Sequence, residues 1–356
     1  MTEPFSLATL LRDNIKKLVP YSSARDEFKG EASVWLDANE NAFGSPYSKN
    51  YNRYPDPLQH KLKSRLHQIK GVPAENIFLG NGSDEAIDIL FRAFCEPGLD
   101  NVILVPPTYG MYEVSANINN VHCKKVPLTK DYQLDLDGIA SAIDARTKLI
   151  FICSPNNPTG NSINRQDIET ILVNFDGLVI VDEAYINYAK QLSFTKNLAE
   201  FPNLVVLQTL SKAWGLAALR LGMAFASIEI IGVFNKIKPP YNINQATQDI
   251  VLESLERVEV VNEWIKETVF EREKLIASLV DIQGVLYITP SDANFVLVKV
   301  NAPGELYAYL VEQGIIVRDR SKVELCEGCL RLTVGVPQEN RTLINAIQNF
   351  YGQRNG

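Results

Sequence analysis

Cysteine and histidine are scarce in this chain. Its 356 residues include five cysteines and three histidines. An odd and scattered set of cysteines argues for reduced thiols and against a disulfide framework. Cys326 and Cys329 have the C-x-x-C spacing, but no second pair follows, and His60, His67 and His122 lie far away in the sequence. We therefore expect no metal site and interpret the two thiols as part of a turn.

Long apolar runs and excess positive charge are missing too. No run approaches the ~18 residues that would cross a bilayer, and the N-terminal sequence Met-Thr-Glu-Pro-Phe lacks the basic and apolar parts of a secretory signal. The 35 Lys and Arg residues stand against 42 Asp and Glu, which gives a net charge of -7. We expect a cytoplasmic protein without membrane or nucleic-acid partners, although a local basic pocket for one anion remains compatible with this charge.

Short and uniformly apolar segments are abundant in the first two thirds of the chain. Because helical or loop segments separate them, they predict an α/β fold with a mainly parallel sheet that is covered on both faces. The strands are expected near Ile77 and at Val102–Val105, Leu149–Cys153, Leu178–Val181, Leu204–Leu207 and Met223–Ala226. After the break at Lys238-Pro-Pro-Tyr241, apolar segments at 294–300, 314–318 and 330–334 predict a smaller α+β domain.

Helical periodicity marks several other segments. A possible short helix within residues 1–20 ends at Pro20, whereas residues 21–57, rich in Asn, Pro, Gly and Tyr, are expected to be irregular. An irregular segment of this length favours a functional or interface role. Further helices are expected near 58–69, over a long charged stretch from 245 to 280, and near 338–351.

The segment from Thr209 to Arg220 carries the strongest chemical signal. Lys212 follows an expected buried strand, with Ser211 before it and Arg220 eight residues after it. A lysine whose amine is neutral can attack a carbonyl and form a Schiff base, and serine with arginine suits a phosphate ester. An aldehyde together with a phosphate describes pyridoxal phosphate. Taken alone, Lys212 and Arg220 fit solvent-exposed positions in an ordinary strand, loop and helix equally well.

Two glycine- and proline-containing motifs offer further sites for such a cofactor. The motif from Gly80 to Glu85, with Ser83 and Asp84, combines a glycine turn with a helix start that can bind phosphate, or it is an ordinary capping loop. Tyr109, after Pro106-Pro-Thr, is placed to stack on a flat cofactor, or it simply packs.

Two more motifs follow expected strands. Asn157, within Ser154-Pro-Asn-Asn-Pro-Thr-Gly160, can donate to a phenolate-like oxygen or belong to a proline-rich turn. Asp182 ends an apolar strand, where it can keep a pyridine nitrogen protonated or merely cap a helix. Tyr185 is placed to hydrogen-bond a ring hydroxyl. Each simple alternative is reasonable alone, but the ordered occurrence of all these motifs disfavours the alternatives together.

Together the motifs resemble those of fold-type I pyridoxal-phosphate enzymes, and most of all the histidinol-phosphate aminotransferases. The resemblance also covers Arg53-Tyr-Pro-Asp-Pro57, Ala293-Asn-Phe-Val296 and Leu330-Arg-Leu-Thr-Val-Gly335. It implies a seven-stranded large domain at 46–238, a small C-terminal domain at 239–356, and an N-terminal arm at 1–45 that includes part of the small domain. Two departures, the second alanine in Leu216-Ala-Ala-Leu-Arg220 and Ala42 after Asn39-Glu-Asn, alter loops without removing a chemical group.

The resemblance implies a role for each motif residue. Lys212 would form the Schiff base with pyridoxal phosphate, Asp182 would bind the pyridine nitrogen, and Tyr109 would stack on the ring. Asn157 and Tyr185 would hold the ring oxygen. The cofactor phosphate would be held by Ser83, Asp84, Ser211 and Arg220, together with Tyr54 from a second subunit, so that a homodimer is implied.

Substrate recognition is assigned to Tyr21, Asn294, Arg318 and Arg331. In the resembled family, arginines at the positions of Arg318 and Arg331 meet the substrate phosphate. Without the resemblance, two surface ion pairs would be the slightly favoured interpretation. The implied reaction moves an amino group between histidinol phosphate with 2-oxoglutarate and imidazole-acetol phosphate with glutamate. An aromatic amino-acid aminotransferase, a threonine-phosphate decarboxylase and a non-catalytic regulator that binds pyridoxal phosphate remain alternatives.

Overall fold

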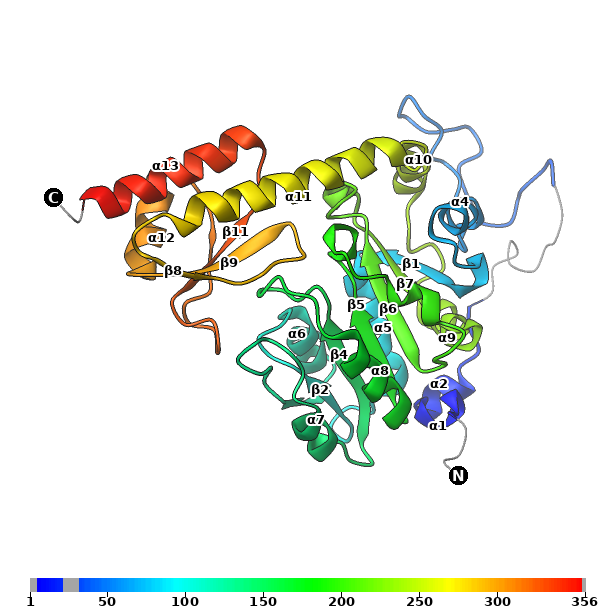
Figure 1. Ribbon diagram of the computed structural model, residues 1–356. Helices are drawn as coiled ribbons and strands as arrows, with labels where there is room; N and C mark the ends of the chain where they lie inside the picture. The colour runs from blue at the N-terminus through cyan, green and yellow to red at the C-terminus, as the bar shows by residue number, and fades with distance from the viewer. Residues whose placement is uncertain (1–4, 22–31, 354–356) are drawn as a thin grey trace.

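Seven strands form the large sheet of the protein in the order β1-β7-β6-β5-β4-β2-β3 (Figure 1). The computed structural model describes residues 5–21 and 32–353. The strands are β1 (Ile77–Asn81), β2 (Asn101–Leu104), β3 (His122–Lys125), β4 (Thr147–Cys153), β5 (Leu178–Asp182), β6 (Leu204–Thr209) and β7 (Leu221–Phe225). The pairs that join β3, β2, β4, β5 and β6 are parallel, whereas β7 is antiparallel to both neighbours. The predicted mainly parallel α/β sheet is confirmed.

The large sheet is apolar on both faces, which is why its strands read as continuous apolar runs. In β5, Val179 and Val181 belong to the core on one face, whereas Leu178 and Ile180 belong to the core on the other. The first core includes residues of α4 (His60–Lys70), α7 (Leu136–Ala142) and α8 (Arg165–Asn174). The second includes residues of α5 (Ser83–Phe94), α6 (Met111–Ile118) and α9 (Ile228–Ile237).

A second, antiparallel sheet has the strand order β10-β11-β9-β8. Its strands are β8 (Val285–Ile288), β9 (Phe295–Val300), β10 (Arg318–Asp319) and β11 (Cys329–Thr333). Helices α12 (Pro303–Glu312) and α13 (Pro337–Gln353) pack with this sheet around a separate core. The predicted smaller α+β domain is therefore confirmed.

One long helix, α11 (Val258–Val280), connects the two sheets (Figure 1). Val261, near its start, packs in a core of the large sheet, whereas Leu275 and Leu279 pack in the core of the small sheet. The preceding helix, α10 (Gln245–Ser254), also packs on the large sheet, through Val251. Residues on both sides of 238 thus share one core, and the domain limits at residues 45 and 238 remain predictions.

Three predicted elements differ in the structure. The stretch from 245 to 280 is two helices, because the chain leaves helical geometry between Leu255 and Arg257 while its apolar residues continue. The predicted N-terminal helix is two short helices, α1 (Leu7–Leu10) and α2 (Asp13–Lys17). Arg12 is extended between them, and its N–H donates to the carbonyl of Ala93. The strand predicted at 314–318 pairs only at Arg318–Asp319.

The sequence pattern also missed two strands. β3 has the sequence His-Cys-Lys-Lys and lies at the edge of the large sheet. An edge strand has a neighbouring strand on one side only, so it is partly exposed and can carry polar residues. β8 is likewise an edge strand, at the end of the small sheet away from β10, and it is partly exposed along its length. Short 3₁₀ turns occur at Ala74–Asn76, Ile186–Tyr188, Phe194–Asn197 and Ala217–Leu219.

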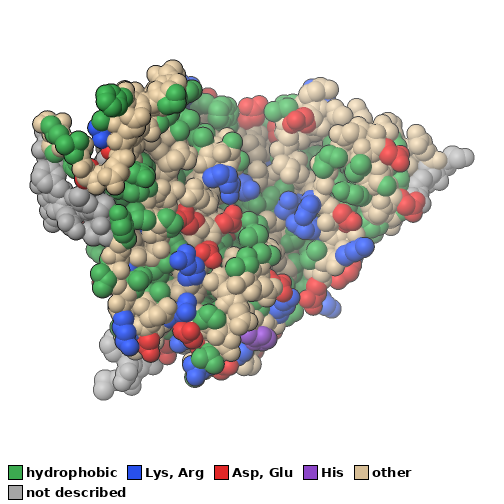
Figure 2. Space-filling model, turned by 180° about the vertical axis from the view of Figure 1, so that it is seen from behind, with side chains coloured by type: hydrophobic (Ala, Val, Ile, Leu, Met, Phe, Trp, Pro, Cys, Tyr) green, Lys and Arg blue, Asp and Glu red, His purple; other side chains and the backbone are tan. Residues whose placement is uncertain are grey.

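The surface and the helices bear on possible partners. Basic and acidic side chains are interspersed on the face that Figure 2 shows. Within residues 5–21 and 32–353, no helix combines the length and the apolar character needed to cross a membrane.

Candidate active site

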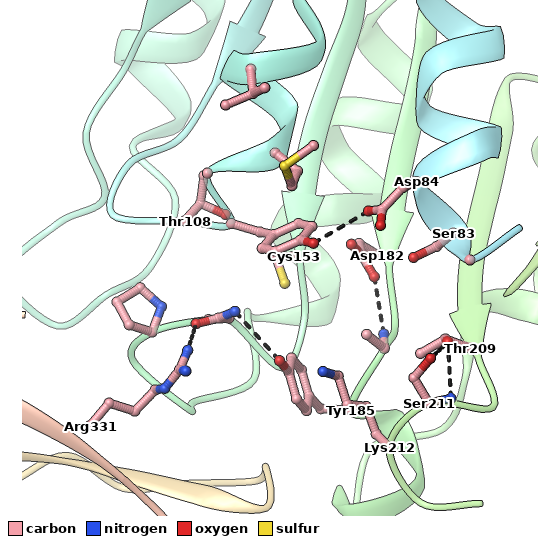
Figure 3. A pocket seen from close by; sticks show the side chains of 18 of the residues that line it. Ser83, Asp84, Thr108, Cys153, Asp182, Tyr185, Thr209, Ser211, Lys212 and Arg331 are labelled. Carbon is pink, nitrogen blue, oxygen red and sulfur yellow. Dashed lines mark hydrogen bonds between the residues drawn. The ribbon is translucent and has the colours of Figure 1, made fainter. Parts of the chain in front are cut away.

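The carboxyl ends of the parallel strands border a cavity of about 680 Å³. Loops that follow β2, β4, β5 and β6 must meet at one edge of the sheet, because these strands run in the same direction. These loops bring Tyr109, Asn157, Tyr185 and Lys212 to the cavity, and Arg331 reaches it from the small sheet (Figure 3). The volume lies within the range of about 300–1,000 Å³ that is usual for small-molecule sites.

Asp182 is a buried carboxylate in the cavity wall, 3% exposed. Its Oδ2 accepts a hydrogen bond from the Tyr112 hydroxyl at 2.6 Å, and its Oδ1 accepts one from the Ala184 N–H at 3.1 Å. Burial raises the pKa of Asp182 to about 6, while the Tyr112 hydrogen bond opposes this rise. The carboxylate is therefore suited to pair with a cationic ring nitrogen. The sequence did not single out Tyr112, which by pattern is an ordinary core residue.

A corner that could hold an anion lies where β1 leads into α5. Gly82 has φ +72 and its N–H donates to the carbonyl of Arg220 at 2.6 Å. Arg220 is itself left-handed, and its guanidinium lies 3.4 Å from the Asp84 carboxylate. The start of α5 and strand β7 approach so closely that a Cβ on Gly222 would lie 2.1 Å from the backbone nitrogen of Ser83. This packing places a guanidinium beside a helix N-terminus, which together favour a phosphate.

Lys212 follows β6 and lines the same cavity. Its Nζ lies 5.6 Å from the centre of the Tyr185 ring. Partial burial lowers the pKa of Lys212, and the charge of Arg331 lowers it further. Both effects increase the fraction of neutral, nucleophilic amine. The preceding Ser211 is fixed by Thr209, whose Oγ1 accepts from the Ser211 N–H at 3.0 Å and donates to its hydroxyl at 2.9 Å.

A chain of hydrogen bonds joins the small sheet to the large one. Arg331 donates to Oδ1 of the buried Asn157 at 2.5 Å, and Nδ2 of Asn157 donates to the Tyr185 hydroxyl at 3.4 Å (Figure 3). The Arg331 guanidinium also lies over the Phe295 ring, 5.1 Å from its centre. Burial lowers the pKa of Arg331. The orientation of one arginine is thus coupled to the residues around Tyr185.

Arg318 and Arg331 are direct partners in the pairing of β10 with β11. Opposite residues of an antiparallel pair share one face of the sheet, and both arginines line the cavity. The structure therefore provides the register that the sequence left open. It also places Arg320 along the same cavity, which the sequence did not indicate because an arginine near a turn has no distinctive pattern.

Three predicted site residues lie outside this cavity. Tyr54 borders another cavity and stacks on Tyr241, with ring centres 4.5 Å apart. Tyr21 is 73% exposed. The carbonyl of Asn294 accepts a hydrogen bond from the Val334 N–H at 2.9 Å, and the residue is absent from the cavity wall. The roles of these three residues remain predictions.

The family follows from comparison with known proteins. The model of the family described as aminotransferase class I and II matches residues 27–347. A histidinol-phosphate aminotransferase of Parabacteroides distasonis is 56% identical over 344 residues, which is 97% of this chain and 99% of the relative. That of Cytophaga hutchinsonii is 54% identical over 346 residues, again 97% and 99% of the two chains.

The chain belongs to the class I and II aminotransferase family.

Solved structures of other proteins share the fold of this aminotransferase. A histidinol-phosphate aminotransferase from Sinorhizobium meliloti, in complex with pyridoxal-5'-phosphate, has a TM-score of 0.76, with 23% identity over 88% of this chain and 89% of that one. An L-threonine-O-3-phosphate decarboxylase from Porphyromonas gingivalis has a TM-score of 0.69, with 22% identity over 85% and 91% of the chains. At such identity the likeness concerns the fold alone.

Pyridoxal phosphate is the cofactor of this family, and the cavity of the aminotransferase fits it. The buried Asp182 suits a protonated ring nitrogen, Tyr109 supplies an aromatic face, and the corner around Ser83 and Arg220 suits a phosphate.

Among the residues that the structure describes, no group of His, Cys, Asp and Glu is arranged to hold a metal ion. Cys326 and Cys329 are buried free thiols.

We predict that Asp182→Asn lowers turnover by orders of magnitude but stabilises the cofactor-free protein above about pH 6. The amide cannot hold the proton of the ring nitrogen, and it removes the cost of burying a carboxylate. A rise of the Asp182 pKa from 3.8 to about 6 corresponds to a gain of about 3 kcal/mol at pH 8. Thermal unfolding of both cofactor-free proteins between pH 4 and pH 8 measures this gain.

The sign of this pH dependence follows from the direction of the pKa shift. The folded-state pKa is above the unfolded value, so the stability of the wild-type protein that comes from protonated Asp182 is present below 3.8 and is lost as the pH rises to about 6. The advantage of the variant should therefore shrink as the pH falls through 6 and vanish near 3.8. An advantage that does not depend on pH would contradict this account.

Proposed function

We propose that this aminotransferase is a cytoplasmic homodimer that transfers the amino group between L-histidinol phosphate and 2-oxoglutarate in histidine biosynthesis. The paired arginines Arg318 and Arg331, in the same cavity as Lys212, are the observation that carries the choice of substrate. They offer a phosphate-sized anion two planar guanidinium groups. Two relatives named histidinol-phosphate aminotransferase match nearly the whole chain at 56% and 54% identity, which supports the same reaction here.

The large domain holds the cofactor in this proposal. Pyridoxal phosphate, when bound, supplies an aldehyde that accepts amino groups and a ring that withdraws electrons from the substrate. Asp182 keeps the ring nitrogen protonated, and Tyr109 packs on the ring. Asn157 and Tyr185 hold the ring oxygen. The phosphate is held by Ser83, Asp84, Ser211 and Arg220.

Lys212 is the catalytic residue of the proposed reaction. Its Nζ would hold the cofactor through the aldehyde in the resting enzyme. As a free amine, Lys212 would be the group that takes and returns the proton of the substrate carbon. The lowered pKa of Lys212, caused first by burial and then by Arg331, favours the neutral amine that both tasks require.

We predict that Lys212→Ala abolishes transamination and leaves the protein folded. Loss of the amine removes both the covalent attachment and the proton carrier. Borohydride reduction of the wild-type holoenzyme followed by peptide mapping should place the label on the peptide that contains Lys212. The matched control is Lys190→Ala, an exposed lysine outside the cavity, which should keep full activity. A label on any other lysine would refute the assignment.

The proposed dimer places Tyr54 of one subunit in the active site of the other. Tyr54 is 50% exposed and lies away from the central cavity of its own chain. The same N-terminal region exposes Leu36 at 85% and Phe43 at 102%. Apolar side chains of this size on one segment support coverage by a second copy.

Hybrid dimers test this arrangement of Tyr54. Tyr54→Phe should weaken cofactor binding by removing a hydroxyl that donates to the phosphate, by about tenfold. Co-expression of Tyr54→Phe and Lys212→Ala chains with different tags gives hybrids that contain one intact site if Tyr54 acts across the interface. Such hybrids should bind cofactor with wild-type affinity at that site and turn over. If Tyr54 acts within its own chain, the hybrid site that keeps Lys212 also carries the Tyr54→Phe change, so it should bind the cofactor about tenfold more weakly than the wild type.

The choice of substrate is tested with Arg318→Ala and Arg331→Ala. Either change should cost on the order of 2–5 kcal/mol in kcat/KM for histidinol phosphate, as expected for cutting one side of a charge pair that the bound substrate would bury. The loss for unphosphorylated histidinol should be much smaller. Arg331→Ala should also weaken the binding of glutamate, whose carboxylates would occupy the same pocket.

The two variants differ in how cleanly they report on phosphate binding. Arg331 bonds to Asn157, so its loss also disturbs the ring-oxygen contacts, whereas Arg318 makes no such bond in the described structure and its loss should leave the cofactor spectrum intact. Equal losses for both amines would exclude phosphate recognition and favour an aromatic amino-acid aminotransferase. Release of carbon dioxide from threonine phosphate would instead identify a decarboxylase.

A further inference from the structure

Arg320 shares a face with Arg318 at the edge of the small sheet. Residues two apart in an extended strand point to the same side, and the N–H of Arg320 donates to the carbonyl of Cys329 at 2.9 Å, which continues the pairing of β10 with β11. The intervening Asp319 is engaged locally, where its carboxylate accepts from the Ser321 N–H. Arg318, Arg320 and Arg331 therefore line the same cavity.

The guanidinium of Arg320 has no partner in the part of the chain that the structure describes. Its Nε is buried without a hydrogen bond, as is the Nε of Arg331. No carboxylate of the described residues forms an ion pair with Arg320. Burial and the charges of Arg331 and Arg318 lower its pKa, so the surroundings disfavour its charged form. Buried polar groups without partners are uncommon in folded proteins, which indicates that a ligand supplies the missing acceptor.

The distribution of charge around the cavity indicates the kind of ligand. The two acidic residues of the wall, Asp84 and Asp182, lie on the large domain, where Asp84 is already paired with Arg220. The three arginines of the small domain face the cavity from the other side. A single carboxylate carries too little charge to match them, whereas a phosphate monoester carries about -1.5 to -2 at neutral pH.

We propose that Arg320 is a third anion-binding residue of the substrate site and that it makes the site selective for a phosphate dianion. This inference rests on the proposed function, because it concerns the phosphate end of the same substrate. Arg320 approaches that end beside Arg318 and donates through the Nε that is otherwise unpaired. The same residue would bind one carboxylate of the dicarboxylic substrate in the other half-reaction.

Arg320→Gln in the holoenzyme is the central test. The kcat/KM for histidinol phosphate should fall by about ten- to a hundredfold, as expected for losing a hydrogen bond to a charged group. The loss should appear in KM, with kcat nearly unchanged, because Arg320 would bind the phosphate and take no part in the proton transfer at Lys212. The kcat/KM for unphosphorylated histidinol should change by less than about twofold, since this amine lacks the group that Arg320 binds.

Two comparisons separate binding from other effects. Lys322→Gln removes the same charge from the same segment, yet Lys322 is exposed and outside the cavity, so it should alter neither amine. The analogue of histidinol phosphate that lacks the amino group cannot react, and calorimetry should show that its Kd rises in Arg320→Gln by the same factor as KM. Arg320→Lys keeps the positive charge and should lose less than Arg320→Gln, which provides a second variant if the glutamine protein does not fold.

The outcomes distinguish this inference from the proposed function. If Arg318→Ala discriminates between the two amines but both Arg320 variants bind the analogue like the wild type, the role of Arg320 is refuted and the function stands. An equal loss for both amines in Arg320→Gln, or a loss that Lys322→Gln reproduces, also refutes it. If Arg318→Ala and Arg331→Ala show no discrimination either, the proposed substrate itself fails.

Discussion

The parallel direction of β2, β4, β5 and β6 is the constraint on which the active site depends. It gathers the carboxyl ends of four strands at one edge, so that residues spread from Tyr109 to Lys212 border one cavity. The strands need crossover helices to run in this way, and those helices cover both faces of the sheet. The same arrangement thus creates the hydrophobic cores and brings the reactive side chains together.

Charge is divided between the two sides of the cavity. The large domain supplies the buried carboxylate of Asp182 and the corner at Arg220, whereas the small domain supplies arginines that lack acidic partners in the described structure. The hydrogen bond from Arg331 to Asn157 links these sides. In the proposed function, a substrate anion that binds Arg331 would therefore also affect Asn157 and Tyr185, which would couple recognition to the reacting centre.

The sequence predicted the parts of the fold whose physical cause is local or periodic. The central strands read as apolar runs because both of their faces are buried, and they were found nearly at their observed limits. The edge strand β3 was missed because half of its environment is solvent and it carries two lysines. The break between α10 and α11 was missed as well, since apolar residues continue across it. At Arg12 the interruption comes with a tertiary hydrogen bond to Ala93, which no local pattern encodes.

By itself the sequence determined the family, the cofactor chemistry and the identity of most residues around Lys212, because these residues stand in short motifs directly after buried strands. Only the tertiary structure decided how separate segments meet. It set Arg318 opposite Arg331, turned the Tyr112 hydroxyl toward Asp182, and brought Arg320 to the cavity with an unpaired Nε. These contacts depend on strand register and on the packing of two domains. Both are fixed by interactions between residues far apart in the chain, and the spacing of residues along the sequence carries no record of them.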